Sequence, residues 1–181
     1  MIIRRSGEAD SDGICDAHQS AFGSVQGQEI VDLVKAMLKD PSGAPMLSLV
    51  ASSDQGILGH VLFTKASISG TDQSISARLL APLCVRREHQ RAGIGSALVR
   101  QGLRELAVDG VGMVFVLGDP AYYGRFGFTP ALAHGLVPPH ELTEPYREAW
   151  MVNELTPGKL IGCHGRVRCP DSISDLQYWQ E

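Results

Sequence analysis

Residues 79–106 decide the fold, and they read LLAPLCVRREHQRAGIGSALVRQGLREL. An apolar run ends at Val85, a charged segment follows, and the pattern becomes helical after Gly93 and Gly95. A strand that passes through a glycine-bearing loop into a helix brings unpaired backbone N–H groups and the positive end of the helix dipole to one place. Glycine lets the backbone approach a phosphate closely and accepts a positive φ. The stretch therefore predicts an anion-binding site at this loop.

Two common phosphate-binding motifs do not fit the loop. No lysine follows either glycine, so the GxxxxGK[ST] phosphate loop is absent, and Leu98 stands where a dinucleotide fingerprint needs its third glycine. A structural alternative stays open, in which both glycines only shape a turn. The nearby arginines would then form a solvated face; they are Arg86, Arg87 and Arg91.

The composition favours one globular domain at residues 1–181 and limits its partners. The chain has 181 residues, 44% of them hydrophobic, which is enough for one sizeable core. A net charge of −4 argues against a broad nucleic-acid or membrane-binding surface. The N-terminus carries charge from Arg4 and lacks an apolar export segment, and no window approaches about eighteen apolar residues. We expect a cytoplasmic protein that binds neither nucleic acid nor membrane.

The four cysteines predict thiols rather than a disulfide framework. Cys15, Cys84, Cys163 and Cys169 are scattered along the chain without paired spacing. Cys163 is followed by His164, but zinc sites usually present closer pairs of ligands. We therefore expect no metal site.

Hydrophobic periodicity and turn residues predict the order of elements. We expect helices at residues 8–22, 26–39, 94–108 and 121–126, and strands at residues 2–4, 46–51, 57–64, 75–85, 111–117, 149–155 and 160–168. Residues 69–74 read as a polar loop. Pro82 predicts a bulge in its strand, because proline removes a ladder donor. The short apolar run at residues 111–117 is typical of a buried parallel strand, which completes a βαβ unit.

Two motifs in this region resemble those of the GCN5-related N-acetyltransferase (GNAT) family. Gln90-Arg91-Ala92-Gly93-Ile94-Gly95 resembles the family's Gln/Arg-x-x-Gly-x-Gly/Ala signature, which follows a strand ending in a hydrophobic triplet, here Leu83-Cys84-Val85. Further on, residues 122–128 resemble the downstream motif, in which a tyrosine precedes a turn ending in Gly-Phe. Both motifs occur in the family's order. Together with the strand pair expected near the C-terminus, they are similar to the YhbS-like bacterial branch.

The resemblance implies an α/β fold of the α+β GNAT type. Such a fold has a central mixed, mostly antiparallel sheet with a splayed parallel strand pair, flanked by helices. Residues 1–130 would form its core, residues 131–170 a strand extension, and residues 171–181 a tail. The implied co-substrate is acetyl-CoA, bound through its pantetheine arm and its pyrophosphate. The implied cofactor-binding residues are Leu83, Val85, Gln90, Arg91, Ala92, Gly93, Gly95 and Ser96.

The implied reaction is direct transfer of the acetyl group to a primary amine. Tyr123 occupies the position from which the family's tyrosine donates a proton to the departing sulfur; the alternative is a half-buried aromatic with its hydroxyl at the surface. We expect a structural role for Tyr122. The general base is left open among Glu29, His60 and a water molecule. Cys84 is a further candidate, and its structural alternative is a small side chain that fills the core.

Several features limit what the resemblance carries over. The family often has an asparagine near the cofactor where this chain has Asp119-Pro120, so that contact is not expected here. We assign Arg125 to the surface. The acceptor is open between a small metabolite and a protein amino group, and a homodimer is open as well. Because fold alone does not fix activity, a non-catalytic acyl-CoA sensor or a partner-binding domain is the competing hypothesis.

Overall fold

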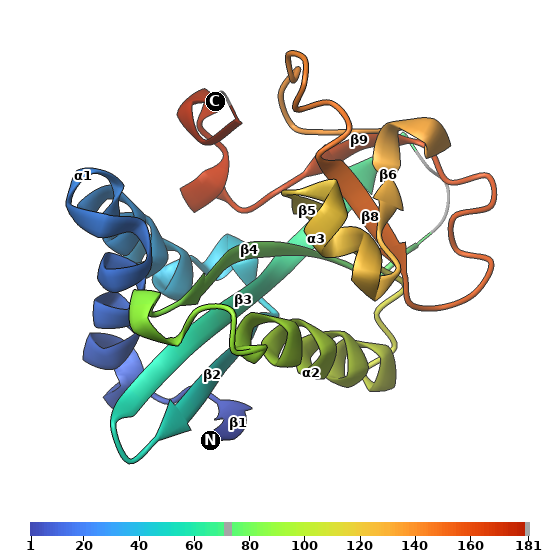
Figure 1. Cartoon of the computed structure of the whole chain (residues 1–181). Helices are drawn as coiled ribbons and strands as arrows, with labels where there is room; N and C mark the ends of the chain where they lie inside the picture. Colours follow the sequence, from blue (N-terminus) through green and yellow to red (C-terminus); the bar gives the residue numbers. More distant parts are fainter. Residues whose placement is uncertain (71–73, 180–181) are drawn as a thin grey trace.

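A computed structural model of the chain describes residues 1–70 and 74–179 (Figure 1). Its centre is a mixed sheet in which the strands follow the order β1-β2-β3-β4-β5-β8-β6, with β9 pairing β3 and β7. The strands are β1 (Ile2–Arg5), β2 (Leu47–Ser53), β3 (Gly56–Ser69), β4 (Ala77–Val85), β5 (Met113–Leu117), β6 (Thr129–Pro130), β7 (Leu136–Val137), β8 (Trp150–Glu154) and β9 (Gly165–Arg168). The helices are α1 (Ser11–Lys39), α2 (Ile94–Val108) and the short α3 (Pro120–Tyr123). The predicted fold class is confirmed.

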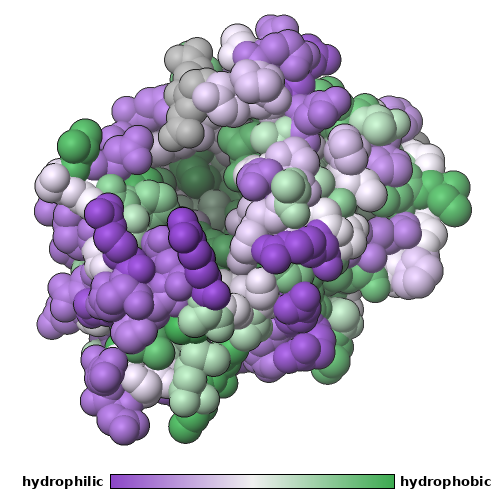
Figure 2. Space-filling view, in the orientation of Figure 1, coloured by the Kyte–Doolittle hydropathy of each residue, from purple (hydrophilic) through white to green (hydrophobic). Residues whose placement is uncertain are grey.

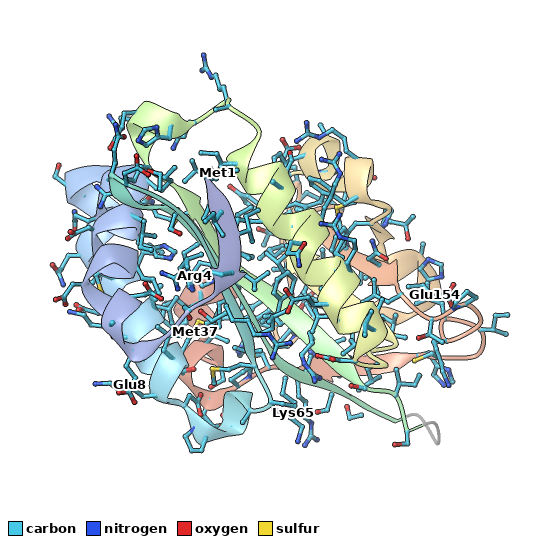
Figure 3. The ribbon with its side chains drawn as sticks, turned by 90° about the horizontal axis from the view of Figure 1, so that it is seen from below. Met1, Arg4, Glu8, Met37, Lys65 and Glu154 are labelled. Atoms are coloured by element: carbon cyan, nitrogen blue, oxygen red, sulfur yellow. The ribbon has the colours of Figure 1, made fainter. Side chains whose placement is uncertain are left out.

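Two helices cover opposite faces of the first four strands. Strands β1 to β4 form an antiparallel meander, in which successive side chains alternate between the two faces. One face packs Leu49 and Val61 against Leu98 of α2, and the other packs Val50 against Ile14 of α1. Figure 3 shows α1 and α2 on the two sides of the strands, with Met37 on the side of α1 that faces the sheet.

The two helices expected before β2 run together as α1. The interruption between them is a kink at Gly23, whose φ of 76° and ψ of −167° are not helical. The start predicted at residue 8 is three residues early, because Glu8–Asp10 forms a 3-10 turn before the α-helix begins at Ser11. None of the helices in the described ranges is long and apolar enough to cross a membrane.

The expected bulge in β4 is present, and it lies where β4 leaves its parallel neighbour. Val61 pairs Leu83 and Phe63 pairs Leu80, so Ala81 and Pro82 together stand opposite one residue of β3. On its other side, β4 pairs β5 only from Ala77 to Leu79. Beyond that point the described residues give this edge of β4 no partner strand, and the parallel pair is splayed as predicted.

The C-terminal part differs from its prediction in one strand. The strand expected at residues 149–155 is present as β8, which pairs β5. The strand expected at residues 160–168 is wrong in its first half, since only Gly165–Arg168 is extended. Gly162 and Gly165 have φ values of 71° and 138°, which turn the chain away from a regular strand. Of the loop predicted at residues 69–74, Ser69 belongs to β3, and residues 71–73 lie outside the described residues.

The end of the chain packs against the core. Asp171–Ile173 and Leu176–Trp179 are 3-10 turns, and the indole ring of Trp179 lies 5.7 Å from that of Trp150, which in turn stacks on Phe115 at 5.3 Å. The last two residues of the predicted tail lie outside the described ranges. Figure 1 shows this C-terminal segment, residues 171–179, over the α1 side of the sheet.

Candidate active site

The loop between β4 and α2 holds its backbone in an unusual conformation. Arg91 has a φ of 62°, which non-glycine residues rarely adopt, and Gly93 has a φ of 81° at the N-cap of α2. A residue other than glycine held in the left-handed region costs about 1–3 kcal/mol, and such strain clusters at ligand-binding sites. A Cβ atom added at Gly93 would meet no heavy atom within 4 Å. Glycine is therefore favoured at this position by the positive φ and not by a lack of space.

This loop exposes a run of backbone donors. The first helical hydrogen bond of α2 runs from the Ala97 amide to the Gly93 carbonyl, at 3.0 Å. Within the described part of the chain, the amides of residues 91–96 have no hydrogen-bond acceptor. These six N–H groups lie at the positive end of the α2 dipole, where an anion is stabilised.

A cavity of about 510 Å³ lies over these amides. Its lining residues are Leu83, Cys84, Val85, His89, Gln90, Arg91, Gly93, Ile94, Gly95, Ser96, Tyr122 and Arg125. Among the predicted cofactor-binding residues, all but Ala92 line it. The apolar side chains come from the unpaired edge of β4 and the cationic ones from the loops, so one end suits an apolar arm and the other an anion. We call it the cofactor cavity.

Two residues that line the cofactor cavity were assigned other roles from the sequence. Tyr122, expected to be structural, lies so close to α2 that a Cβ atom on Gly95 would stand 2.8 Å from its hydroxyl oxygen. Arg125, expected at the surface, places its guanidinium carbon 4.5 Å from the centre of the Tyr122 ring and donates from Nε to the Tyr122 carbonyl. The spacing of Tyr122 and Arg125, three residues apart in a helical turn, was the sequence signal for this stacked pair.

Tyr123 lies beside the cofactor cavity, between aromatic rings and Gly118. Its side chain is 8% exposed, and its ring centre lies 5.0 Å from that of Tyr122 and 5.6 Å from that of Phe128. A Cβ atom on Gly118 would collide with the Tyr123 ring, so only glycine fits there. Burial raises the pKa of the Tyr123 phenol above its ordinary value, which keeps the hydroxyl protonated.

A second cavity, of about 300 Å³, begins where β4 and β5 separate. Its lining comes from the splayed strands, the loop before β8 and the C-terminal segment: Leu79, Leu80, Ala81, Leu117, Gly118, Tyr146, Ala149, Ile173, Tyr178 and Trp179. In the space-filling view a hollow with a hydrophobic floor opens here, between α1 and β5 (Figure 2). We call it the apolar cavity. Since Gly118 lines it and Tyr122 lines the cofactor cavity, Tyr123 lies between the two.

Two of the candidate general bases, Glu29 and His60, line neither cavity. Glu29 is exposed on α1. His60 is fully buried, with its Nδ1 atom 3.0 Å from Nε2 of His18 and its Nε2 atom 2.9 Å from the Ser48 hydroxyl. Burial lowers the pKa of His60 to about 3 and that of His18 to about 4.

Cys84 lines the cofactor cavity, but it is not activated. Burial raises the pKa of the Cys84 thiol to about 12, so the nucleophilic thiolate does not form at neutral pH. Within the described residues no group of three or more histidine, cysteine, aspartate or glutamate side chains has the arrangement of a metal site.

A mixed sheet with a splayed parallel pair, and a donor-rich loop at the end of one splayed strand, is the architecture of the acetyltransferase fold. The chain belongs to the GNAT family, because the model of the acetyltransferase (GNAT) domain matches residues 2–131. It is 36% identical over 165 residues to YjhQ of Escherichia coli K12, an uncharacterized N-acetyltransferase, and the match covers 91% of this chain and 89% of YjhQ.

Two solved structures extend the comparison. The crystal structure of the N-acetyltransferase YhbS from Escherichia coli in complex with CoA has a TM-score of 0.84 at 30% identity, covering 96% of this chain and 92% of YhbS. A GNAT family acetyltransferase from Brucella melitensis, in complex with acetyl-CoA, has a TM-score of 0.69 at 29% identity, covering 95% and 97%. The expected resemblance to the YhbS-like branch is confirmed.

Proposed function

We propose that this chain is an N-acetyltransferase, with residues 1–181 as one domain, that moves an acetyl group from acetyl-CoA to a primary amine. One observation carries the proposal: of the six residues at 91–96 whose amides have no described acceptor, all but Ala92 line a cavity that continues along the unpaired edge of β4. The relatives bound to CoA and acetyl-CoA support the choice of ligand.

The cofactor cavity fits acetyl-CoA in both its charge and its shape. The amides of Arg91 to Ser96 would hold the pyrophosphate, with the guanidinium groups of Arg91 and Arg125 adding positive charge. Leu83 and Val85 would flank the pantetheine arm, whose amides need backbone partners such as the free edge of β4 offers. The thioester would then lie near Tyr123, which contacts Gly118 of the apolar cavity and Tyr122 of the cofactor cavity.

The acetyl-CoA thioester supplies the acyl group, and the residues around it manage one proton. As the amine nitrogen bonds to the acetyl carbon, the carbon–sulfur bond breaks and the sulfur keeps the electron pair. The protonated phenol of Tyr123 gives its proton to that sulfur. The proton that the amine loses restores the phenol through water, because no described residue lining the apolar cavity carries a charged side chain.

Ligand-dependent thermal melting tests the binding half of this proposal. A ligand that binds only the folded state stabilises it by about 2.7 kcal/mol at a hundredfold excess over its Kd. We expect acetyl-CoA and CoA to raise the melting temperature, and NADH and ATP to raise it less. A shift with NADH alone would contradict the assignment.

Thiol release tests the chemical half. CoA thiol should appear in proportion to acetylated amine when acetyl-CoA is supplied with a panel of primary amines. Tight acetyl-CoA binding without turnover on a broad panel would instead favour the acyl-CoA sensor.

A further inference from the structure

The apolar cavity has a chemistry of its own, distinct from that of the cofactor cavity. The ten described residues that line it include aliphatic and aromatic side chains and one glycine, but no charged side chain. Arg147 and Glu148 lie between Tyr146 and Ala149 in sequence, yet neither lines it, and Arg147 pairs instead with Glu144 at 3.4 Å. A charged group that entered this cavity would lose water and find no ion partner among the described lining residues, which is costly.

The wall formed by the C-terminal segment is held in place at both of its ends. At its start, Oδ2 of Asp40 accepts a hydrogen bond from the Ser172 amide at 2.8 Å, and the Ser42 hydroxyl accepts one from the Asp171 amide at 2.9 Å. At its end, the Trp179 ring packs edge-on against Trp150 of β8, with ring centres 5.7 Å apart. The C-terminal segment therefore forms an ordered wall of the apolar cavity, beside the splayed strands and the loop before β8.

Two tyrosine hydroxyl groups can form hydrogen bonds with a ligand in the apolar cavity. Tyr146 and Tyr178 line it at partly exposed positions, and in the described ranges neither hydroxyl has a hydrogen-bond partner. A neutral amine or a carbonyl group on a ligand can use such hydroxyls, whereas a second ammonium group far from the reacting nitrogen meets no carboxylate among the described lining residues.

We propose that the apolar cavity binds the body of the acceptor, and that the acceptor is a monoamine with an uncharged, mainly hydrophobic aliphatic or aromatic body. The inference rests on the proposed function and names its substrate class. The cavity opens to solvent at the splay, so an acceptor can enter from outside while acetyl-CoA occupies the cofactor cavity (Figure 2). Its volume of about 300 Å³ is at the lower end for small-molecule sites, which suits a compact amine.

A matched pair of acceptors provides the test. Hexylamine and 1,6-diaminohexane have the same reacting end and chain length, and they differ by one ammonium group at the far end. We expect kcat/KM for acetyl transfer to hexylamine to exceed that for the diamine at least tenfold, with phenethylamine also a good acceptor. Equal rates, or a preference for the diamine or for the lysine analogue N-acetyl-lysine amide, would overturn the proposal.

Variants at Ala149 link this preference to the cavity. Ala149→Leu should fill the cavity and lower kcat/KM for hexylamine at least tenfold, while Ala149→Asp should shift the preference toward the diamine. Ala107 is exposed on α2 and lines neither cavity, so Ala107→Leu and Ala107→Asp are the matched controls. Acetyl-CoA affinity should stay unchanged in all four variants. An unchanged amine preference in folded Ala149→Asp would place the acceptor elsewhere.

Two further arms separate this inference from the proposed function. Calorimetric titration of the protein–CoA complex with hexylamine and with 1,6-diaminohexane tests the acceptor site without turnover. Tighter binding of hexylamine supports the proposed acceptor class even if no acetyl transfer is found. Equal binding of the two amines overturns it. If the wild type prefers hexanoyl-CoA over acetyl-CoA with methylamine, and Ala149→Leu abolishes that preference, the cavity binds the acyl chain and the acceptor assignment is wrong.

Discussion

The Nε2 atom of His18 lies 3.0 Å from the Nδ1 atom of His60, and both rings are fully buried between α1 and the sheet. A hydrogen bond between two ring nitrogens needs one N–H and one lone pair, so at least one ring must be neutral. The chain of contacts continues from His60 to the Ser48 hydroxyl and from there to the Ser6 hydroxyl. The Nδ1 atom of His18 has no partner within the described residues.

Acidification should therefore unfold this protein through its buried histidines. Their pKa values, about 4 for His18 and about 3 for His60, lie below the ordinary value of 6.5, so the unfolded state binds more protons as the pH falls from 6.5 toward 4. The stability they confer is present above pH 6.5 and is lost below it. Urea unfolding should show a loss on the order of 2 kcal/mol per histidine between pH 7.5 and pH 5.

Replacing His60 measures how much of this pH-dependent loss of stability comes from one of the two buried histidines. His60→Gln should be less stable than the wild type at pH 7.5, yet it should lose about 2 kcal/mol less on going to pH 5. His164→Gln, at an exposed histidine, should retain the wild-type pH dependence. Parallel pH profiles for wild type and His60→Gln would show that His60 titrates normally in the folded state.

Gly95→Ala should weaken CoA binding through Tyr122. The new Cβ atom would stand 2.8 Å from the Tyr122 hydroxyl oxygen, so the phenol must move within the cofactor cavity. We expect at least a tenfold rise in the Kd for CoA with a small change in unfolding free energy. In a Tyr122→Phe background the same change should cost less, because the clashing atom is absent.

Glycines elsewhere in the site refine that comparison. Gly124→Ala should leave the Kd unchanged, since a Cβ atom there meets nothing within 4 Å. Gly93→Val should weaken binding by a different route, because the φ of 81° disfavours a branched side chain. Unchanged CoA affinity in folded Gly93→Val and Gly95→Ala would show that the two glycines only shape a turn.

Tyr123→Phe should slow the chemical step and leave the affinity for acetyl-CoA nearly unchanged. The change deletes the hydroxyl proposed to protonate the sulfur and keeps the ring that packs against Gly118 and Phe128. General-acid contributions are about a hundredfold to ten-thousandfold, and single-turnover rates should fall within that range. Tyr122→Phe should mainly change CoA affinity. Equal single-turnover rates for wild type and Tyr123→Phe would remove Tyr123 from the mechanism.

Asp40→Ala should loosen the C-terminal segment. The Asp40 carboxylate accepts from the Ser172 amide and also from the Ser42 amide and hydroxyl, and these hydrogen bonds hold its pKa well below the ordinary range. We expect faster hydrogen exchange at residues 171–179 and a higher KM for the amine, with the Kd for CoA unchanged. Asp54→Ala, in the exposed turn between β2 and β3, is the control.

The sequence predicts best what is local in the chain. The anion-binding loop, the bulge at Pro82 and the strand–helix–strand unit all lie within about forty consecutive residues, so periodicity and turn chemistry were sufficient for them. The strand expected at residues 160–168 failed in its first half. Its apolar residues match a strand pattern, but Gly162 and Gly165 have positive φ values, which no apolar pattern indicates. Gly165 packs against the carbonyl of Ser69.

The two cavities of the candidate site likewise differ in how far they can be predicted from local sequence. The cofactor cavity takes most of its lining from residues 83–96, and seven of its twelve lining residues are among those predicted to bind the cofactor. The apolar cavity joins Leu79 to Trp179 across one hundred positions of sequence, and no local pattern indicates that these residues meet. The buried pair of His18 and His60 likewise depends on the packing of α1 against β3.

The wall formed by the C-terminal segment has a practical consequence for anyone who purifies this protein. Trp179 lines the apolar cavity, so an affinity tag fused shortly after it would be attached to a wall of the proposed acceptor site. Met1 is 62% exposed beside β1, at one edge of the sheet and well separated in strand order from β5. A removable N-terminal tag is therefore the form of the protein in which amine preferences should be measured.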